Sequence, residues 1–239
     1  MQQYTYLLVN SCAVVVCFIF SFDKRIRFDR HFGAFACAAI LAAIPFLAWD
    51  IWFTAKGVWW FTKDYTVGTE LAGLPVEEWL FFLCIPFSCT FTYFCLTRFF
   101  RMDWAAGFNN MIAFTTCVGC TLFALLYNAQ LYTLVTAVAT PATMIYLHFF
   151  VKAQWIGKAS FIYLCLMPGF FLVNGILTGT GLEAPIVNYN PDEILNLRML
   201  TIPVEDAVYG YTQFMWVIYF YKIFSKRLVS TEKGAGVNR

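Results

Sequence analysis

The stretch Leu74-Pro75-Val76-Glu77-Glu78 recurs later in the chain as Ile202-Pro203-Val204-Glu205-Asp206. Each copy precedes an apolar, aromatic-rich run of bilayer length, residues 79–96 and 207–224. Paired carboxylates beside such a run are costly unless they are paired, hydrated or used in function. Because the arrangement occurs twice, 128 residues apart, the sequence predicts a duplicated unit and a site built from both copies.

The composition indicates an integral membrane protein. Of 239 residues, 61% are hydrophobic, 20% are aromatic and only 13% are charged, whereas soluble domains carry about 25% charged residues. Basic residues form short clusters rather than one continuous face, which argues against a nucleic-acid partner. The nine cysteines lie in apolar runs and there are only two histidines, His31 and His148, so we expect no metal site.

Apolar runs of about 20 residues predict an all-α protein with seven transmembrane helices. The predicted spans are 4–22, 32–53, 75–97, 106–127, 131–151, 159–178 and 203–224. Residues 46–50, Phe-Leu-Ala-Trp-Asp, resemble 171–175, Phe-Leu-Val-Asn-Gly, so spans one to three match spans five to seven. Four crossings separate the start of one unit from the start of the next, which predicts a parallel repeat about an axis along the membrane normal.

The predicted organisation is therefore three helices, one helix and three helices. The parts are a first repeat at 1–101, a linker helix within 102–130, a second repeat at 131–224 and a polar cytoplasmic tail at 225–239. Of the 16 lysines and arginines, 13 follow odd-numbered spans, so these loops are expected in the cytoplasm and the N-terminus outside. In a bacterium the membrane would be the inner one, and no cleavable signal peptide is expected.

Pro-Val-Glu-Glu by itself can simply begin a helix, because proline suits the first turn and acids suit the positive helix end. Duplication of the phrase, and the additional acid Asp50 inside a span, favour a functional site instead. The candidate catalytic acids and bases are Glu77, Glu78, Glu205 and Asp206, with Asp50, Asn174 and Arg198 as supporting residues. Helical spacing below the acids adds Phe81, Tyr209 and Trp216 as aromatic cavity-lining residues.

This combination suits carbocation chemistry. A carboxylic acid kept protonated in a poorly hydrated site can donate a proton, aromatic faces can stabilise the resulting cation, and a second carboxylate can remove a proton. Neighbouring residues of a helix point about 100° apart, so one acid of each pair should face a shared cavity. The aromatic stripes favour Glu77 and Glu205 for that position.

Pro-x-Glu-Glu and Pro-x-Glu-Asp, each opening the third helix of a three-helix unit, resemble the membrane-integral, flavin-independent lycopene cyclases. These occur as two small subunits, as a fused chain and as the cyclase part of fungal bifunctional carotenoid enzymes. The resemblance covers about residues 4–224 and fits the fused form. It implies redox-neutral, proton-initiated closure of β-rings at the ends of lycopene, giving γ-carotene and β-carotene. It also implies no cofactor, a lipophilic carotenoid substrate, and possible association with other carotenoid enzymes.

Other interpretations remain open at this point. Seven spans with parallel repeats also describe SWEET-like transporters of small solutes, although those need polar residues near the midplane of both halves. A retinal-binding photoreceptor needs a lysine inside the last span, and none precedes Lys222 there. A hydratase would add water to the same carotenoid cation. The sequence does not decide between β- and ε-rings, one or both ends, the identity of the acid and the base, or the oligomeric state.

Overall fold

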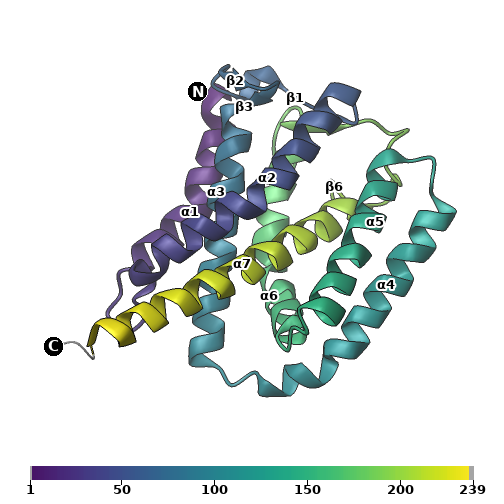
Figure 1. Ribbon diagram of the computed structural model, residues 1–239. Helices are drawn as coiled ribbons and strands as arrows, with labels where there is room; N and C mark the ends of the chain where they lie inside the picture. Colours follow the sequence, from purple (N-terminus) through teal and green to yellow (C-terminus); the bar gives the residue numbers. More distant parts are fainter. Residues whose placement is uncertain (1, 237–239) are drawn as a thin grey trace.

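The computed structural model describes residues 2–236, and their side chains through residue 226 (Figure 1). The α-helices of this part are α1 (Thr5–Phe20), α2 (Phe32–Lys56), α3 (Val76–Phe99), α4 (Asn109–Leu126), α5 (Leu131–Ile145), α6 (Ile156–Leu177) and α7 (Val204–Gly236). Short 3-10 helices cover Gln2–Tyr4, Phe28–His31, Lys63–Tyr65 and Asp103–Phe108, and a π-helical turn, Tyr146–Phe150, follows α5. The predicted all-α character holds, but six short strands lie in the loops: β1 (Trp59–Phe61), β2 (Glu70–Leu71), β3 (Leu74–Pro75), β4 (Val187–Tyr189), β5 (Arg198–Met199) and β6 (Ile202–Pro203).

Six helical segments of the described chain are long and apolar enough to cross a membrane, which fits a membrane protein. They are Gln2–Phe20, Phe28–Lys56, Val76–Phe99, Asp103–Leu126, Leu131–Phe150 and Ile156–Leu177. Helix α7 is not among them, so a seventh span is not established. The sequence predicted a separate polar tail at 225–239, whereas α7 continues to Gly236. Residues 237–239 lie outside the described residues.

The helices pack as neighbouring pairs around one bundle. Helix α2 packs along α7, α1 packs against α3, and α4 packs against α5 (Figure 1). Ala34 and Ala38 of α2 are buried in a cluster that also contains Tyr221 of α7. Small side chains at four-residue spacing let two helix backbones approach closely, which explains the long contact between α2 and α7.

Tight hairpins lead into α3 and α7. β2 pairs with β3 and β5 pairs with β6, so that Pro75 lies opposite Glu70 and Pro203 lies opposite Arg198. The Val76 N–H donates to the Thr69 carbonyl oxygen at 2.9 Å, and the Val204 N–H donates to that of Leu197 at 3.0 Å. Each acid phrase therefore begins a helix directly after a hydrogen-bonded turn, which fixes the direction in which its carboxylates point.

The loops before these hairpins pair with each other. β1 and β4 are antiparallel, and Trp60 lies opposite Asn188. Just outside this pair, the Thr62 N–H donates to the Ile186 carbonyl oxygen and the Asn190 N–H donates to that of Val58, both at 2.8 Å. The two donors, Thr62 and Asn190, are 128 residues apart, and so are the two acceptors, Val58 and Ile186. In the first bond the earlier loop donates, and in the second the later loop donates. Such an exchange is the local geometry of a two-fold axis passing between the two strands.

Candidate active site

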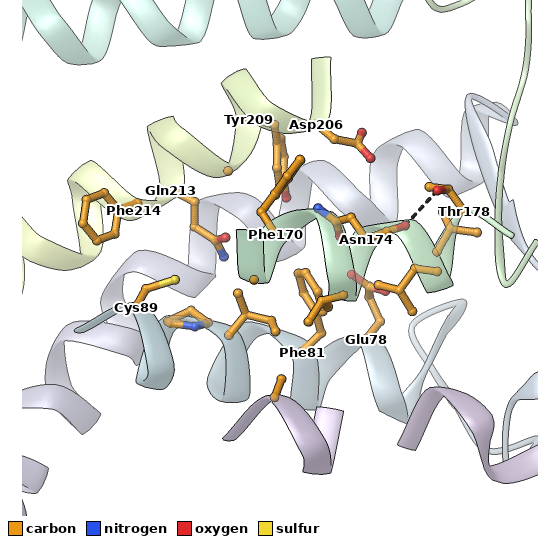
Figure 2. Close-up of a pocket in the computed structure, with 18 of the residues that line it drawn as sticks. Glu78, Phe81, Cys89, Phe170, Asn174, Thr178, Asp206, Tyr209, Gln213 and Phe214 are labelled. Atoms are coloured by element: carbon orange, nitrogen blue, oxygen red, sulfur yellow. Dashed lines mark hydrogen bonds between the residues drawn. The ribbon is translucent and has the colours of Figure 1, made fainter. Parts of the chain in front are cut away.

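A cavity of about 340 Å³ lies among α1, α2, α3, α5, α6 and α7, next to the β1–β4 pair. Its lining runs along α3 from Glu78 to Cys89 and along α7 from Asp206 to Val217. Since an α-helix rises about 1.5 Å per residue, each stretch is about 16 Å long. Figure 2 shows Glu78 and Asp206 near one end of this space and Cys89 and Phe214 near the other. The cavity is therefore elongated, with its carboxyl groups at one end.

The first carboxyl cluster joins α1, α2, α3 and α7. The Tyr6 hydroxyl donates a hydrogen bond to the buried Glu78. The carboxyl group of Glu78 lies close to that of Asp50, which accepts a bond of 3.3 Å from the Tyr209 hydroxyl. Two neighbouring buried carboxyl groups repel each other when both are ionised, which favours a proton on one of them. The Asp50–Glu78 pair is thus suited to hold an exchangeable proton at the cavity wall.

The second cluster surrounds Asp206 of α7. The Tyr132 hydroxyl donates to Asp206 Oδ1 and the Tyr189 hydroxyl donates to Oδ2, both at 2.8 Å. Burial and the neighbouring Asp206 raise the pKa of the Tyr189 hydroxyl well above its usual range, so this group remains a proton donor. Two donated hydrogen bonds favour an ionised carboxylate. Asp206 is therefore arranged to accept a proton, in contrast to the Asp50–Glu78 pair.

The expectation that Glu77 and Glu205 face the cavity was wrong. Glu77 Oε1 accepts a hydrogen bond from the Val67 N–H at 2.6 Å, and Glu205 Oε1 accepts one from the Leu195 N–H at 2.6 Å. The other oxygen of each is buried and has no hydrogen-bond partner within the described residues. These two acids lie on the side of their helices that holds the preceding loop, so the next acid in the chain takes the cavity side.

The error extends to Trp216, one of the two aromatic residues placed below Glu205. Trp216 does not line the cavity; its indole Nε1 donates to Thr143 Oγ1 at 3.0 Å, and its ring stacks on Tyr146. Trp216 shares the face of Glu205, and that face meets α5. The stripe that does line the cavity starts one residue later and consists of Asp206, Tyr209, Gly210, Gln213 and Val217.

Of the remaining predicted residues, Phe81, Tyr209 and Asn174 line the cavity together with Asp50 (Figure 2). Arg198 does not. Its Nη1 donates to the Thr201 carbonyl oxygen at 2.6 Å, and its Cζ lies 5.9 Å from the centre of the Tyr189 ring. Arg198 is exposed in the β5–β6 hairpin and contacts the ring of a tyrosine that binds Asp206, rather than the carboxylate itself.

Three tyrosines that donate hydrogen bonds to the cavity acids were missed by the sequence analysis: Tyr6, Tyr132 and Tyr189. A signal for two of them was present. Tyr6-Leu-Leu-Val9 resembles Tyr132-Thr-Leu-Val135 at the start of the first helix of each predicted repeat. Tyr189 gave no such signal, because its position opposite Trp59 depends on pairing between two distant loops.

Aromatic rings surround the acid end of the cavity. Tyr209 contacts Phe46 and Trp49 edge to face, with ring centres 5.2 and 5.0 Å apart. Trp59 contacts Tyr132 in the same manner at 5.1 Å. Ring faces of this kind attract positive charge. The site can therefore stabilise a cation formed close to Asp50, Glu78 and Asp206.

The cavity also reaches the outer surface of the bundle. Cys12 of α1 and Leu172 of α6 both contribute to its lining and are exposed, Leu172 with 68% of its surface. Both lie in helices that are apolar enough to cross a membrane. The cavity wall at α1 and α6 is thus formed by residues that also face the outside of the bundle. Within the described residues, no group of three or more His, Cys, Asp and Glu side chains is placed to hold a metal ion.

Comparison with known proteins gives one family. The sequence model of the lycopene cyclase family matches residues 3–96 and 129–224. A bifunctional lycopene cyclase/phytoene synthase of Podospora anserina is 28% identical over 96 residues, which are 40% of this chain and 15% of that protein. The alignment therefore covers only a small part of this relative's length. No solved structure matches the chain.

Proposed function

This chain belongs to the lycopene cyclase family, and from that premise we propose that it closes β-rings at the ends of lycopene. A proton adds to the terminal double bond of the linear C40 carotenoid and leaves a tertiary cation. A double bond further along the same chain attacks the cation and forms the ring. Loss of a proton from the ring then gives the neutral product, so the reaction consumes no electrons and needs no redox partner.

One observation carries this proposal: a pair of neighbouring carboxyl groups and a separate carboxyl group with two hydrogen-bond donors line the same cavity. We assign proton donation to the Asp50–Glu78 pair. We assign final proton removal to Asp206, which accepts hydrogen bonds from Tyr132 and Tyr189. Groups whose surroundings separate their proton affinities are the usual arrangement for an acid and a base in one site.

The surroundings of these carboxyl groups support a carbocation as intermediate. The Tyr209 and Trp59 rings line the cavity together with the acids and can stabilise positive charge before the ring closes. Burial of the acids limits water, which would otherwise add to the cation and give an alcohol in place of a ring. These features favour cyclisation over hydration at the same carotenoid end.

The shape of the cavity supports a long lipophilic substrate. One end of the molecule would lie among the carboxyl groups, while the polyene would follow the stripe formed by Phe81, Ile85 and Cys89 of α3. The remainder of the substrate would leave between α1 and α6, where Leu172 is exposed. A carotenoid dissolved in the membrane could then enter without crossing water. Either end could enter in turn, which supports formation of both the monocyclic and the bicyclic product.

We further propose that the chain is a duplication of three helices joined by a linker helix, with all seven helices crossing the membrane. The two segments matched by the family model begin 126 residues apart, end 128 residues apart, and leave out α4. The exchanged hydrogen bonds around β1 and β4 support the same relation. The repeats would be 1–101 and 131–224, both in one orientation, with the N-terminus outside and the C-terminus in the cytoplasm.

The test is to produce the chain in a bacterium that accumulates lycopene and to separate the pigments by chromatography. We expect γ-carotene and β-carotene, without addition of flavin or metal. An Asp206→Asn variant, shown by immunoblot to be in the membrane, should leave lycopene unchanged. Unchanged lycopene with membrane-inserted wild-type protein would contradict the proposal. ε-ring products would correct the ring type, and hydroxylated acyclic products would indicate a hydratase.

A further inference from the structure

A second cavity, of about 640 Å³, lies at the opposite ends of the helices from the carboxyl clusters. It is lined by the last turns of α3, by the loop between α5 and α6, and by α7 beyond Tyr219. Four lysines contribute to it: Lys152, Lys158, Lys222 and Lys226. No aspartate or glutamate is among the described residues that line it. We call this space the lysine pocket. The proposed cyclisation uses none of its residues.

Aromatic rings and two further lysines surround Lys222 in the pocket. Its ammonium group lies 5.9 Å from the ring centres of both Tyr93 and Trp155. Lys158 and Lys226 line the same pocket, and each lies near enough to Lys222 for its positive charge to repel that of Lys222. Gathering like charges in a partly dry space costs free energy unless an anion offsets them. The pocket is therefore arranged for a negatively charged ligand.

The ion pair between Lys158 and Asp103 does not bring an acidic group into the pocket. Lys158 Nζ lies 3.5 Å from Asp103 Oδ1, but the Asp103 side chain is 89% exposed, whereas that of Lys158 is 24% exposed. The acid is outside the cavity while the lysine is part of its wall. Exposed pairs of this kind contribute little to stability. Lys152 has a left-handed backbone with φ of 54°, a conformation that costs free energy and tends to persist at binding sites.

We propose that the lysine pocket binds a phosphate group, and that this phosphate is the headgroup of an anionic membrane lipid. The pocket lies at the ends of segments that are apolar enough to cross a membrane. Trp155 and Tyr219 line it, and Phe149 and Phe150 beside it are 64% and 76% exposed. Aromatic residues of this kind stand at the membrane–water boundary, and basic pockets there bind phosphate headgroups. The acyl chains would lie along the exposed phenylalanines.

The test is native mass spectrometry of the full chain in a neutral detergent, titrated with dioleoylphosphatidylglycerol or with dioleoylphosphatidylcholine. The test variant is Lys158→Gln/Lys222→Gln. The control variant, Lys24→Gln/Arg25→Gln, loses the same charge from exposed positions in the turn after α1. We expect the anionic lipid to bind about tenfold more weakly to the test variant and within twofold of wild type to the control.

Each outcome decides the proposal. Equal binding of the two lipids, or unchanged binding of phosphatidylglycerol by the test variant, would overturn it. Glycerol 3-phosphate is the competitor that separates the two sources of phosphate. If glycerol 3-phosphate binds as tightly as the lipid, and if the test variant loses this binding, the pocket binds a soluble phosphate and the lipid assignment is wrong. If the double variant fails to fold, as judged by its melting temperature, the single Lys222→Gln variant is compared with Lys24→Gln.

Discussion

Trp60 of β1 lies directly opposite Asn188 of β4, although 128 residues separate them in the chain. The same shift relates Glu78 to Asp206, and these two acids line one cavity. The chemistry on the two sides has diverged. Asp50 lies beside Glu78, whereas the alignment of residues 46–50 with 171–175 places Gly175 at the position of Asp50, and glycine has no side chain that could carry a proton. The exchanged pairing of β1 and β4 thus lies next to a chemically asymmetric site, which fits one acid and one base.

Substitution of Asp206 should abolish ring closure. In Asp206→Asn the amide keeps the size of the side chain and can still accept from Tyr132, but it cannot take the final proton. We expect the conversion of lycopene to fall by at least about 100-fold, the usual contribution of a general base. The measurement is the rate of carotene formation in isolated membranes at matched protein content. A variant with more than a tenth of the wild-type rate would remove Asp206 from the role of base.

The Asp50–Glu78 pair predicts unequal losses of activity when its two members are substituted. Asp50→Asn leaves Glu78 able to carry the proton, whereas Glu78→Gln removes the group that also binds Tyr6. We expect a fall of about 100-fold in Glu78→Gln and a fall of about tenfold in Asp50→Asn. The double variant should be no worse than Glu78→Gln, because residues that act as one unit are not additive. Additive losses would show that the two acids act separately.

Glu205 should matter for folding rather than for chemistry. In Glu205→Gln the amide oxygen can still accept from the Leu195 N–H, and we expect a rate within about threefold of wild type. In Glu205→Ala the buried Leu195 N–H and Thr133 hydroxyl lose their acceptor, which should lower the free energy of unfolding by about 1–3 kcal/mol. Thermal melting in detergent measures this loss. Complete loss of turnover in a well-folded Glu205→Gln would restore the sequence-based assignment.

The acid phrases show how far the sequence alone could lead. Their duplication pointed to the starts of α3 and α7 and to acids that meet in one cavity, and both features are present. Which acid of each pair faces the cavity was not predictable. That choice depends on the Val67 and Leu195 N–H groups, which belong to loops whose fold has no periodic pattern. Because Glu205 was expected on the cavity side of its helix, the helical spacing placed Trp216 on that side as well, whereas Trp216 binds Thr143 of α5.

Contacts between distant loops were likewise beyond sequence reasoning. Tyr189 reaches Asp206 only because β4 pairs with β1 across the two halves. Asn188 and Tyr189 stood in a polar loop with no strand signal, since three residues are too few to show alternation. Arg198 was predicted as a supporting residue of the acids, but in the β5–β6 hairpin its guanidinium donates to the Thr201 carbonyl oxygen and lies over the Tyr189 ring.

The tyrosines around Asp206 provide a graded test of the site. Tyr132→Phe and Tyr189→Phe each remove one hydrogen bond to the carboxylate while keeping the ring. We expect each to slow cyclisation by about 10- to 150-fold, corresponding to about 1.5–3 kcal/mol for a hydrogen bond to a charged group. Tyr65→Phe is the control, since Tyr65 is buried outside this cavity. Rates equal to the control would mean that the tyrosines only fill space.

Helix α4 should be fixed to the start of α6 through Gly157. A Cβ atom on Gly157 would lie 2.0 Å from the Ala105 carbonyl oxygen, just before α4, and the Gly157 N–H donates to Asn109 Oδ1 at 2.7 Å. Backbone atoms cannot move aside cheaply, so Gly157→Ala should lower the free energy of unfolding by about 1–3 kcal/mol.

Gly119 of α4 is the matched control, because nothing lies within 4 Å of its added Cβ. Gly119→Ala should melt at or above the wild-type temperature, since alanine favours a helix. Equal melting temperatures for the two variants would mean that α4 is joined to α6 loosely. A selective loss in Gly157→Ala would instead make the contact between Ala105 and α6 a fixed part of the fold, although α4 itself lies outside the segments that match the family.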